Sequence, residues 1–499
     1  MPDSINQRIR SRVLSDRMMS AREAAALIKN GMTIGTVGTP TSGCAVGVFK
    51  ALAERIENGE RFQINLYASG PPGHEVDGLL TEANIIQRRL GQQSNGLLRK
   101  AINQGRIRFI DQPLGKYPER VRAGFFSRVD LAVIEATAIT EDGHIIPSTS
   151  VLDAPSYVLS ADATIVEINT CCPLEMEGIH DIYVPEPPPN RRPIPIMHTG
   201  DRIGHPYIPA GEDKIIAVVE SHTPYASGEP SHLDSSSKAI AQHLMEFWYE
   251  EMGNQRLPEN LLPIEVGLGT TTDAVLRSLA VSGLRDLEIY SGVLGDGVLD
   301  LIDSGKLRAA SGTGLYLSAE GYKRFFRDIK KYKETIVLRP LDIADSPEVI
   351  QRLGIIALNG AVEVDIYGHV NGSHVPRGIV SGVGGGGEFA HNSFLSTFLL
   401  PSTRKGGTVS TIVPMVLHVD FSEHAVDVIV TEQGLADLRG LDPVERAYAI
   451  IQHCAHPTFR PLLEEYLERA MRERGGHEPH LLEEALSFHV RTDRKGSMS

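Results

Sequence analysis

The amino-acid sequence predicts an α/β protein made of two related open domains whose sheets are mostly parallel. Short apolar runs alternate with helical patterns along most of the chain. These runs are nearly continuous in apolar character, as expected for strands that helices cover on both faces. The second half of the chain also repeats the order of strand, glycine-rich turn and helix found near the start of the first half.

The elements of the first half begin with a helix. Ser20 and Glu23 fit a capping box at its start, and Asn30 followed by Gly31 fits its end. The strands expected after this helix lie at 32–37, 64–67, 131–134, 164–166 and 214–219.

Residues 185–209 are rich in proline. Because proline does not suit central strands or helix interiors, we expect a long irregular crossover here. We place a domain boundary at its end, which gives an N-terminal domain over 1–210 and a C-terminal domain over 211–499.

The C-terminal domain is expected to continue the alternation of helices and strands. Its expected elements are a helix at 236–252, a strand at 263–266, a helix at 272–280 and an amphipathic helical segment at 443–474. We expect the last of these to pack on the outside. The polar tail from Arg491 is expected to fray.

Composition narrows the class of protein. The formal net charge of −14 argues against a nucleic-acid-binding protein, which would carry a basic patch. The four cysteines lack zinc-type spacing and indicate free thiols in a reducing compartment. No run of about 18 apolar residues occurs, and residues 1–22 lack the apolar core of a signal peptide. We therefore expect a cytoplasmic protein that binds neither nucleic acid nor membrane.

Two glycine-rich stretches are candidate anion sites. Residues 382–387 match G-x-G-x-x-G, but no acidic residue occurs at 389–419, so we do not expect a dinucleotide site. The backbone N–H groups of this stretch suit an oxyanion, and a tight loop without a ligand is the alternative. Residues 267–271 follow a strand and open a helix, where free N–H groups favour a phosphate or carboxylate. A helix cap made by threonine or aspartate is the alternative there.

Other chemical signatures are weak or absent. The sequence contains neither a P-loop motif nor a G-x-S-x-G elbow. His418 and Asp420, with His424 nearby, resemble part of a metal site. Such groups are more often hydrogen-bonded structural residues, and we predict no metal.

Longer stretches of the sequence are more specific. The strongest is Val430-Thr-Glu-Gln-Gly-Leu-Ala-Asp-Leu-Arg-Gly440. The others lie at 133–143, 145–150, 178–183, 365–371 and 413–415. Together they resemble the acetyl-CoA hydrolase/transferase family, whose members are class I CoA-transferases, and the resemblance covers about residues 20 to 490.

The resemblance implies two α/β domains with the active site between them. It implies coenzyme A (CoA) or acyl-CoA as a substrate rather than a tightly bound cofactor, a small carboxylic acid as the second substrate, and a homodimer. The family's chemistry is ping-pong: a glutamate carboxylate attacks the acyl-CoA, and a glutamyl-CoA thioester forms by way of an anhydride.

The family's site residues are carried over by position. The CoA loop falls on Gly267, Leu268, Gly269, Thr270 and Thr271. The oxyanion glycine falls on Gly385, a CoA-contacting lysine on Lys405 and a site-lining glutamate on Glu432. These positions belong to the expected C-terminal domain.

Two catalytic positions depart from the family pattern, and an arginine found in related enzymes has no counterpart at 221–230. The nucleophilic glutamate is replaced by Gly292, so the usual thioester cannot form there, and the oxyanion-binding asparagine is replaced by Asp345. Asp345 is a candidate displaced nucleophile or general base for water. An ionised carboxylate would repel a forming oxyanion, so Asp345 must have a different role or be protonated. Glu288 lies four strand residues before Gly292, about 13 Å away and too far to replace the nucleophile.

Three functions remain open at this point. The first is a CoA-transferase that keeps the family reaction through Asp345 or another carboxylate. The second is an acyl-CoA hydrolase in which Gly292 leaves room for water or a larger acyl group. The third is a CoA-binding protein without catalysis.

Overall fold

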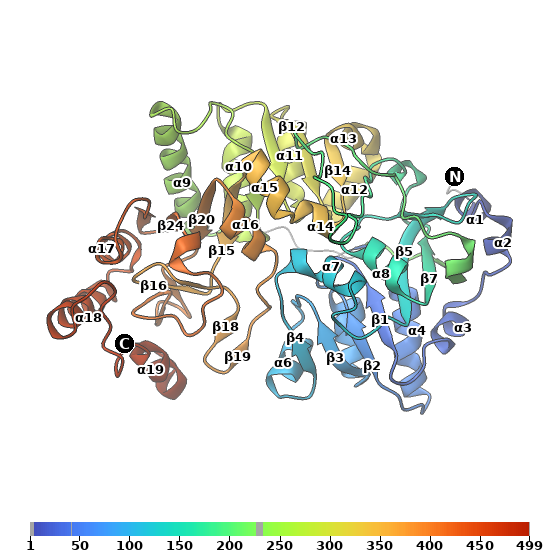
Figure 1. Cartoon of the computed structure of the whole chain (residues 1–499), viewed down its shortest axis with the longest axis horizontal. Coiled ribbons are helices and arrows are strands. Elements are labelled where there is room, and N and C mark those ends of the chain that lie inside the picture. The colour runs from blue at the N-terminus through green and yellow to red at the C-terminus, as the bar shows by residue number, and fades with distance from the viewer. Residues whose placement is uncertain (1–3, 41, 226–232, 499) are drawn as a thin grey trace.

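The computed structural model describes residues 4–40, 42–225 and 233–498. The two halves of the chain lie side by side, each built on a sheet with helices packed on its faces (Figure 1). In the described ranges both sheets are parallel except for one antiparallel strand in each. The fold class predicted from the sequence is therefore confirmed.

The strand predicted after the capped helix, β1, lies in the middle of the first sheet. In spatial order its strands are β4 (Arg108–Ile110), β3 (Ile86–Leu90), β2 (Ile64–Tyr67), β1 (Thr33–Thr36), β5 (Leu131–Ile139), β7 (Ala163–Asn169) and β8 (Ile215–Ser221), and β6 (Ile145–Pro147) pairs with β5. The helices of this half are α1 (Ile5–Arg8), α2 (Arg12–Ser15), α3 (Ala21–Ala26), α4 (Val46–Glu57), α5 (Leu79–Glu82), α6 (Gly96–Asn103), α7 (Tyr117–Arg122) and α8 (Ala154–Ser160).

The capping box acts as predicted, although the helix ends at Ala26, before the expected stop at Asn30 and Gly31. Ser20 accepts a hydrogen bond from the backbone N–H of Glu23, and the Glu23 carboxylate accepts one from the N–H of Ser20 (2.8 Å). This capping box starts α3. The crossover at 185–209 carries no helix or strand, as its proline content predicts.

Strand β8 changes the expected domain boundary. It begins after residue 210, yet it pairs in parallel with β7 and completes the first sheet. The pairing partner lies on the far side of the proline-rich crossover, so local sequence does not reveal it. We therefore propose a boundary between β8 and α9 (Ser235–Gly253).

The second sheet carries the elements around the candidate site. In spatial order its strands are β14 (Ile336–Leu338), β12 (Leu307–Gly312), β10 (Leu287–Tyr290), β9 (Ile264–Val266), β15 (Ile356–Gly360), β20 (Leu395–Leu399), β24 (Val428–Thr431) and β25 (Gly434–Asp437). Short strands outside it are β11 (Val293–Gly295), β13 (Gly314–Tyr316), β16 (Glu363–Asp365), β17 (Val370–Asn371), β18 (His374–Val375), β19 (Gly378–Ile379), β21 (Thr403–Arg404), β22 (Val409–Ser410) and β23 (Ile412–Val413). The helices after α9 are α10 (Thr270–Val281), α11 (Asp296–Asp303), α12 (Ala319–Arg327), α13 (Ile329–Thr335), α14 (Leu341–Ala344), α15 (Pro347–Leu353), α16 (Gly386–Asn392), α17 (Pro443–Cys454), α18 (Arg460–Glu473) and α19 (Ser487–Lys495).

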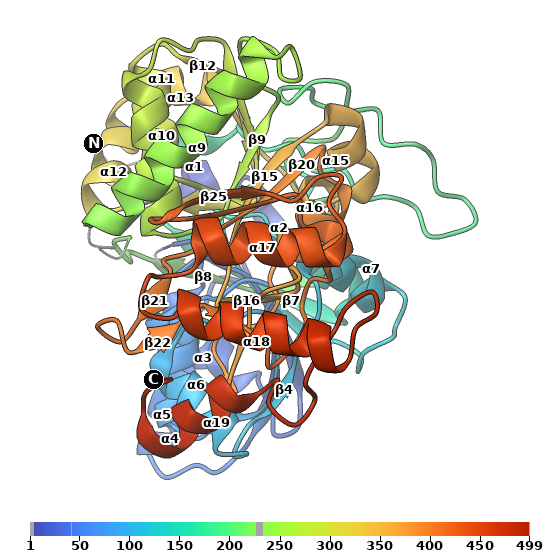
Figure 2. The same ribbon diagram turned by 90° about the vertical axis from the view of Figure 1, so that its left-hand side faces the viewer.

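The C-terminal helices lie on the outside, as expected (Figure 2). The predicted segment at 443–474 is two helices, α17 and α18, rather than one. The expectation that the tail frays is wrong. Residues up to Lys495 are helical, and the N–H of Met498 donates to the carbonyl of Thr408 (3.0 Å). Phe488 and Met498 are buried, and this packing holds the tail.

The two halves share one packed interface. The N–H of Val151 donates to the carbonyl of Thr313 (2.8 Å), and the N–H of Leu341 donates to the carbonyl of Leu152 (2.8 Å). The buried guanidinium of Arg339, in the second half, pairs with the buried carboxylate of Asp181, in the first. The halves are therefore joined by backbone hydrogen bonds, a buried ion pair and a common apolar core.

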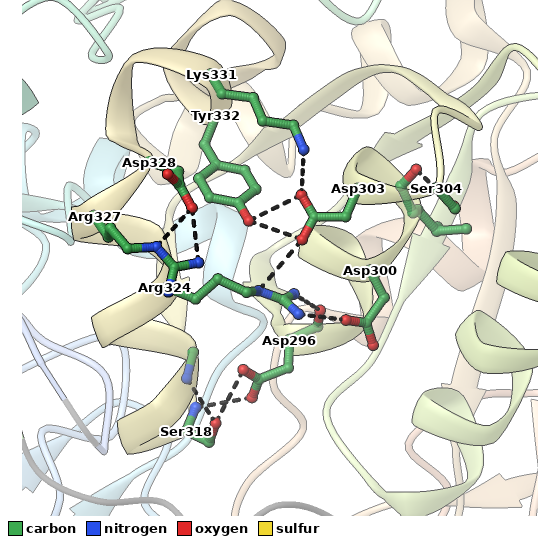
Figure 3. Close-up of polar contacts among 12 residues, drawn as sticks. Asp296, Asp300, Asp303, Ser304, Ser318, Arg324, Arg327, Asp328, Lys331 and Tyr332 are labelled. Carbon is green, nitrogen blue, oxygen red and sulfur yellow. Dashed lines mark hydrogen bonds and ion pairs between the residues drawn. The ribbon is translucent and has the colours of Figure 1, made fainter.

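Helix α11, which follows the Gly292 segment, is braced by a polar network (Figure 3). Arg324 of α12 contacts Asp300 (2.8 Å) and Asp303 (3.6 Å), and the hydroxyl of Tyr332 donates to Asp303 (3.0 Å). The charged groups are partly exposed, so each pair adds little stability alone. Together they tie α11 to α12 and α13.

None of the helices in the described ranges combines the length and apolar character that crossing a bilayer requires.

Candidate functional site

Three predicted site residues, together with Ser402 and Asn359, lie at the carboxyl ends of neighbouring strands of the second sheet. Gly267 follows β9, Gly292 follows β10, Ser402 follows β20 and Glu432 follows β24, while Asn359 lies near the end of β15. These strands are parallel, so their carboxyl ends face the same side. Ligands of open α/β sheets bind at this edge.

The loop at 267–271 leads into a helix. Helix α10 begins at Thr270, and its N-cap residue is Gly269, which has no side chain that could accept a hydrogen bond. Thr272 donates instead to the carbonyls of Gly267 (2.7 Å) and Gly269 (2.9 Å), which holds the loop in shape. The side chain of Leu268 is exposed, and the first-turn N–H groups suit an anion.

Gly292 leaves open space at the sheet edge. A Cβ at this position meets no atom within 4 Å, and the backbone is not left-handed. Its carbonyl accepts hydrogen bonds from both the N–H and the hydroxyl of Thr313 (2.6 Å each). By contrast, a Cβ on Gly312 would lie 2.8 Å from Leu294. Packing therefore requires glycine at 312 but does not require it at 292.

The glycine run and Asp345 are in contact. A Cβ on Gly385 would lie 2.8 Å from a carboxylate oxygen of Asp345, and one on Gly386 would lie 2.7 Å from the amide oxygen of Asn359. The missing side chains let both polar groups approach the backbone of the run. The structure thus brings together two of the residues that the sequence selects separately, Gly385 and Asp345.

Asp345 is a buried and unpaired carboxyl. Its residue is 1% exposed, and neither carboxyl oxygen has a hydrogen-bond partner among the described residues. Burial raises the pKa of Asp345 well above its usual range, and the neighbouring charges of Glu388 and Glu265 raise it further. A protonated carboxyl is a hydrogen-bond donor, as the amide of an asparagine is. This resolves the repulsion that an ionised Asp345 would cause.

Glu388 is a functional candidate that the sequence did not reveal. It lies in the first turn of α16, and both of its carboxyl oxygens are buried without a partner in the described ranges. Burial raises the pKa of Glu388 to about 7. A Cβ on Gly115, from the first half of the chain, would lie 3.0 Å from both Asp345 and Glu388. Asp345 and Glu388 therefore lie close together at the interface of the halves, as a pair of buried acidic residues.

A third carboxyl and an amide lie beside this pair. Burial raises the pKa of Glu265, in β9, to about 8, although its carboxyl accepts a hydrogen bond from the N–H of Leu358 (3.1 Å). The side-chain amide nitrogen of Asn359 has no partner among the described residues. Buried polar groups normally find partners, so this set marks a place where a ligand could supply them.

Glu432 directly follows β24, and Lys405 directly follows β21. Burial alone would raise the pKa of Glu432, but hydrogen bonds from Ser402 and Gln433 outweigh it and keep the pKa of this carboxyl below its usual range. Lys405 is exposed in the turn between β21 and β22. Among the described residues, the ammonium of Lys405 makes no hydrogen bond or ion pair that would connect it to the groups above.

Comparison with known proteins identifies the family of the chain. The family model for the acetyl-CoA hydrolase/transferase N-terminal domain matches residues 2–220, and the model for the C-terminal domain matches residues 321–467. The chain is 44% identical to the succinyl-CoA:acetate CoA-transferase of Clostridium kluyveri, over 99% of this chain and 92% of that protein. It is 40% identical to the acetyl-CoA hydrolase of Eremothecium gossypii, over 99% of this chain and 98% of that protein.

Solved structures show the same fold. RipA from Yersinia pestis superposes with a TM-score of 0.70 at 21% identity, covering 91% of this chain and 97% of that chain. A 4-hydroxybutyrate CoA-transferase from Porphyromonas gingivalis superposes with a TM-score of 0.62 at 22% identity, covering 91% and 98%. The chain therefore belongs to the acetyl-CoA hydrolase/transferase family of enzymes, as its sequence stretches predicted.

Proposed function

We propose that this enzyme transfers CoA between an acyl-CoA and a small carboxylate such as acetate or succinate, and that the acceptor itself replaces the missing glutamate. The observation that carries this proposal is the open space at Gly292. A small carboxylate in that space would stand where the relatives' catalytic carboxylate is expected. The two substrates would then react with each other, and no covalent intermediate would form on the protein.

The proposed reaction needs only the two substrates. The acceptor carboxylate attacks the thioester carbonyl, the C–S bond breaks, and CoA leaves as a thiolate from a mixed anhydride. The thiolate attacks the carbonyl that came from the acceptor, and the original acyl group leaves as a carboxylate. No net proton is gained or lost, so the steps balance without another reactant.

The chain's own groups position and stabilise these steps. Protonated Asp345 donates to the oxyanion, as an asparagine amide would, with the backbone beside Gly385 as a second donor. The N–H groups of the 267–271 loop, with Lys405, bind phosphates of CoA. Glu432, held ionised by Ser402, lines the acceptor side.

Hydrolysis is the second candidate, and the pKa of Glu388 favours it. A carboxyl with a pKa of about 7 suits a general base at neutral pH. A water in the space beside Gly292 would then replace the acceptor. The two candidates differ in one requirement, because only transfer needs a second carboxylate.

The test is release of CoA from acetyl-CoA and succinyl-CoA, with and without acetate or succinate. Transfer predicts new acyl-CoA only when the acceptor is present. Release of CoA without acceptor would instead show a hydrolase, and tight CoA binding without turnover would show a non-catalytic protein. The matched variants are Gly292→Ala and Gly292→Glu. We expect the methyl group to weaken acceptor binding, whereas the glutamate restores a carboxylate on the chain.

We also propose a homodimer in the cytoplasm. Light scattering at micromolar concentration tests the first statement, and a monomer would contradict it. Fractionation of the source cells tests the second.

A further inference from the structure

A cluster of metal-binding side chains lies outside the proposed acyl-CoA site. His374, His418 and Asp420 each present a ligand atom, and these atoms lie within 4.8 Å of one another. The Nε2 atom of His418 lies 3.4 Å from a carboxylate oxygen of Asp420. The two imidazole rings have centroids 4.0 Å apart.

These distances suit a shared ion. Ligand atoms on a tetrahedral metal with bonds of about 2.0–2.1 Å lie about 3.3 Å apart. The separation between His418 and Asp420 already matches this value, and a ligand atom of His374 lies within 4.8 Å of both. Two histidines and one carboxylate are a common ligand set for divalent transition metals.

The surroundings orient the ligands. The hydroxyl of Ser373 donates to Asp420 (2.7 Å) and lies 2.7 Å from Nδ1 of His374. Because that hydroxyl has one proton, its bond to Asp420 makes Nδ1–H of His374 the donor to Ser373. This leaves Nε2 of His374 with a free lone pair. A hydrogen bond from the ring nitrogen that does not bind the metal fixes the tautomer of a metal-bound histidine in this way.

Asp420 is held just as firmly. The N–H of Gly372 donates to its carboxylate (2.7 Å), and the side chain is 4% exposed. The carboxylate therefore faces the histidines with its position fixed from behind. His418 has a side chain 46% exposed, which gives an ion and a bound water access from solvent. A further carboxylate, Asp111 of the first half, lies nearby: the charge of Asp420 raises its pKa, and the charge of His418 lowers it.

The geometry points to a binding site for one divalent transition metal, with Zn²⁺ the best match, held by His374, His418 and Asp420 with a fourth position open to water. This departs from the prediction of no metal made from the sequence, where His424 rather than His374 stood beside the pair. His424 is not one of the three clustered residues and is largely exposed. The third ligand comes from β18, more than 40 residues earlier in the chain.

The site would brace the glycine run. Phe421 follows Asp420, and its ring lies 3.4 Å from the position of a Cβ on Gly386. An ion that fixes Asp420 would thus limit movement of the residue that packs against the run. The proposed role is structural, and no step of CoA transfer depends on it.

Metal binding by the full chain tests this inference. Chelated and dialysed protein is titrated with Co²⁺, and bound metal is followed by visible absorption and by elemental analysis after Zn²⁺ loading. We expect one ion per chain, and we expect at least a tenfold loss of affinity in both His418→Ala and His374→Ala. His424→Ala is the matched control and should bind as the unmodified protein does.

Folding of the variants is checked separately by circular dichroism. His418 is half exposed, so its removal leaves the fold intact, and His374→Ala provides the second arm. Absence of a stoichiometric ion in the unmodified protein would overturn the inference. So would equal binding by the unmodified protein and both histidine variants. Neither readout depends on turnover, so failure here is distinct from failure of the proposed reaction.

Discussion

Replacing Glu388 with glutamine should stabilise the protein, and the gain should grow with pH. The folded protein holds the Glu388 proton more tightly than the unfolded chain does, since burial raises the pKa from 4.5 to about 7. Between these two values the folded state binds more protons, so its free energy of unfolding falls as pH rises. The rise in pKa corresponds to a loss of about 3 kcal/mol above pH 7. Glutamine cannot ionise and avoids this loss.

Fluorescence of Trp248 gives a direct assay. It is the sole tryptophan in the sequence, it is fully buried in α9, and it lies in the same half as Glu388. Urea unfolding at pH 5 and at pH 8 measures how the stability of Glu388→Gln changes relative to the unmodified protein. Glu468→Gln, at an exposed position of α18, is the control and should show no such trend. A stability difference for Glu388→Gln that is equal at both pH values would refute the reasoning.

Three further predictions follow from single side chains. Asp345→Asn should keep kcat within about tenfold because it still donates, whereas Asp345→Ala should lose about 100–1000-fold; equal loss in both would mean that Asp345 is the nucleophile. In urea unfolding, Gly292→Ala should change the free energy of unfolding by less than about 0.5 kcal/mol. Gly312→Ala should lower it by about 1–3 kcal/mol, because Leu294 lies too close to a Cβ at that position. A larger loss at 292 would mean that the space there is not open. Arg339→Leu leaves a buried carboxylate unpaired and should cost about 3–5 kcal/mol, visible as a lower thermal midpoint; an unchanged midpoint would contradict the buried pair.

Much of the fold could be predicted because apolar runs and capping residues act locally. The run at 64–67 is β2, and Ser20 starts α3 through its own hydrogen bonds. Strand pairing is not local, and the sequence gives no sign that β8 returns to β7 after the proline-rich crossover. The ordered tail likewise depends on contacts of Phe488 and Met498 that no local pattern specifies.

In the candidate site, too, single residues could be predicted from local sequence, but their contacts could not. Motif positions identified Gly385 and Asp345 separately, and the fold places them in contact. Glu388 follows the glycine run directly, so proximity to that motif was its only signal in the sequence. Its pairing with Asp345 arises from the turn into α16 and from the approach of Gly115 across the interface. His374 was missed as a partner of His418 for a similar reason, because helix α16 and strand β20, among other elements, separate them in the chain.

Initial rates measured while both substrates are varied test the central claim most directly. If the acceptor carboxylate occupies the space beside Gly292 and attacks the acyl-CoA itself, both substrates must be bound before CoA moves. Reciprocal plots should then intersect, and mass spectrometry should find no CoA attached to the chain. Parallel plots, together with an enzyme–CoA adduct after acyl-CoA alone is added, would show that a carboxylate of the protein is the nucleophile and would contradict the account.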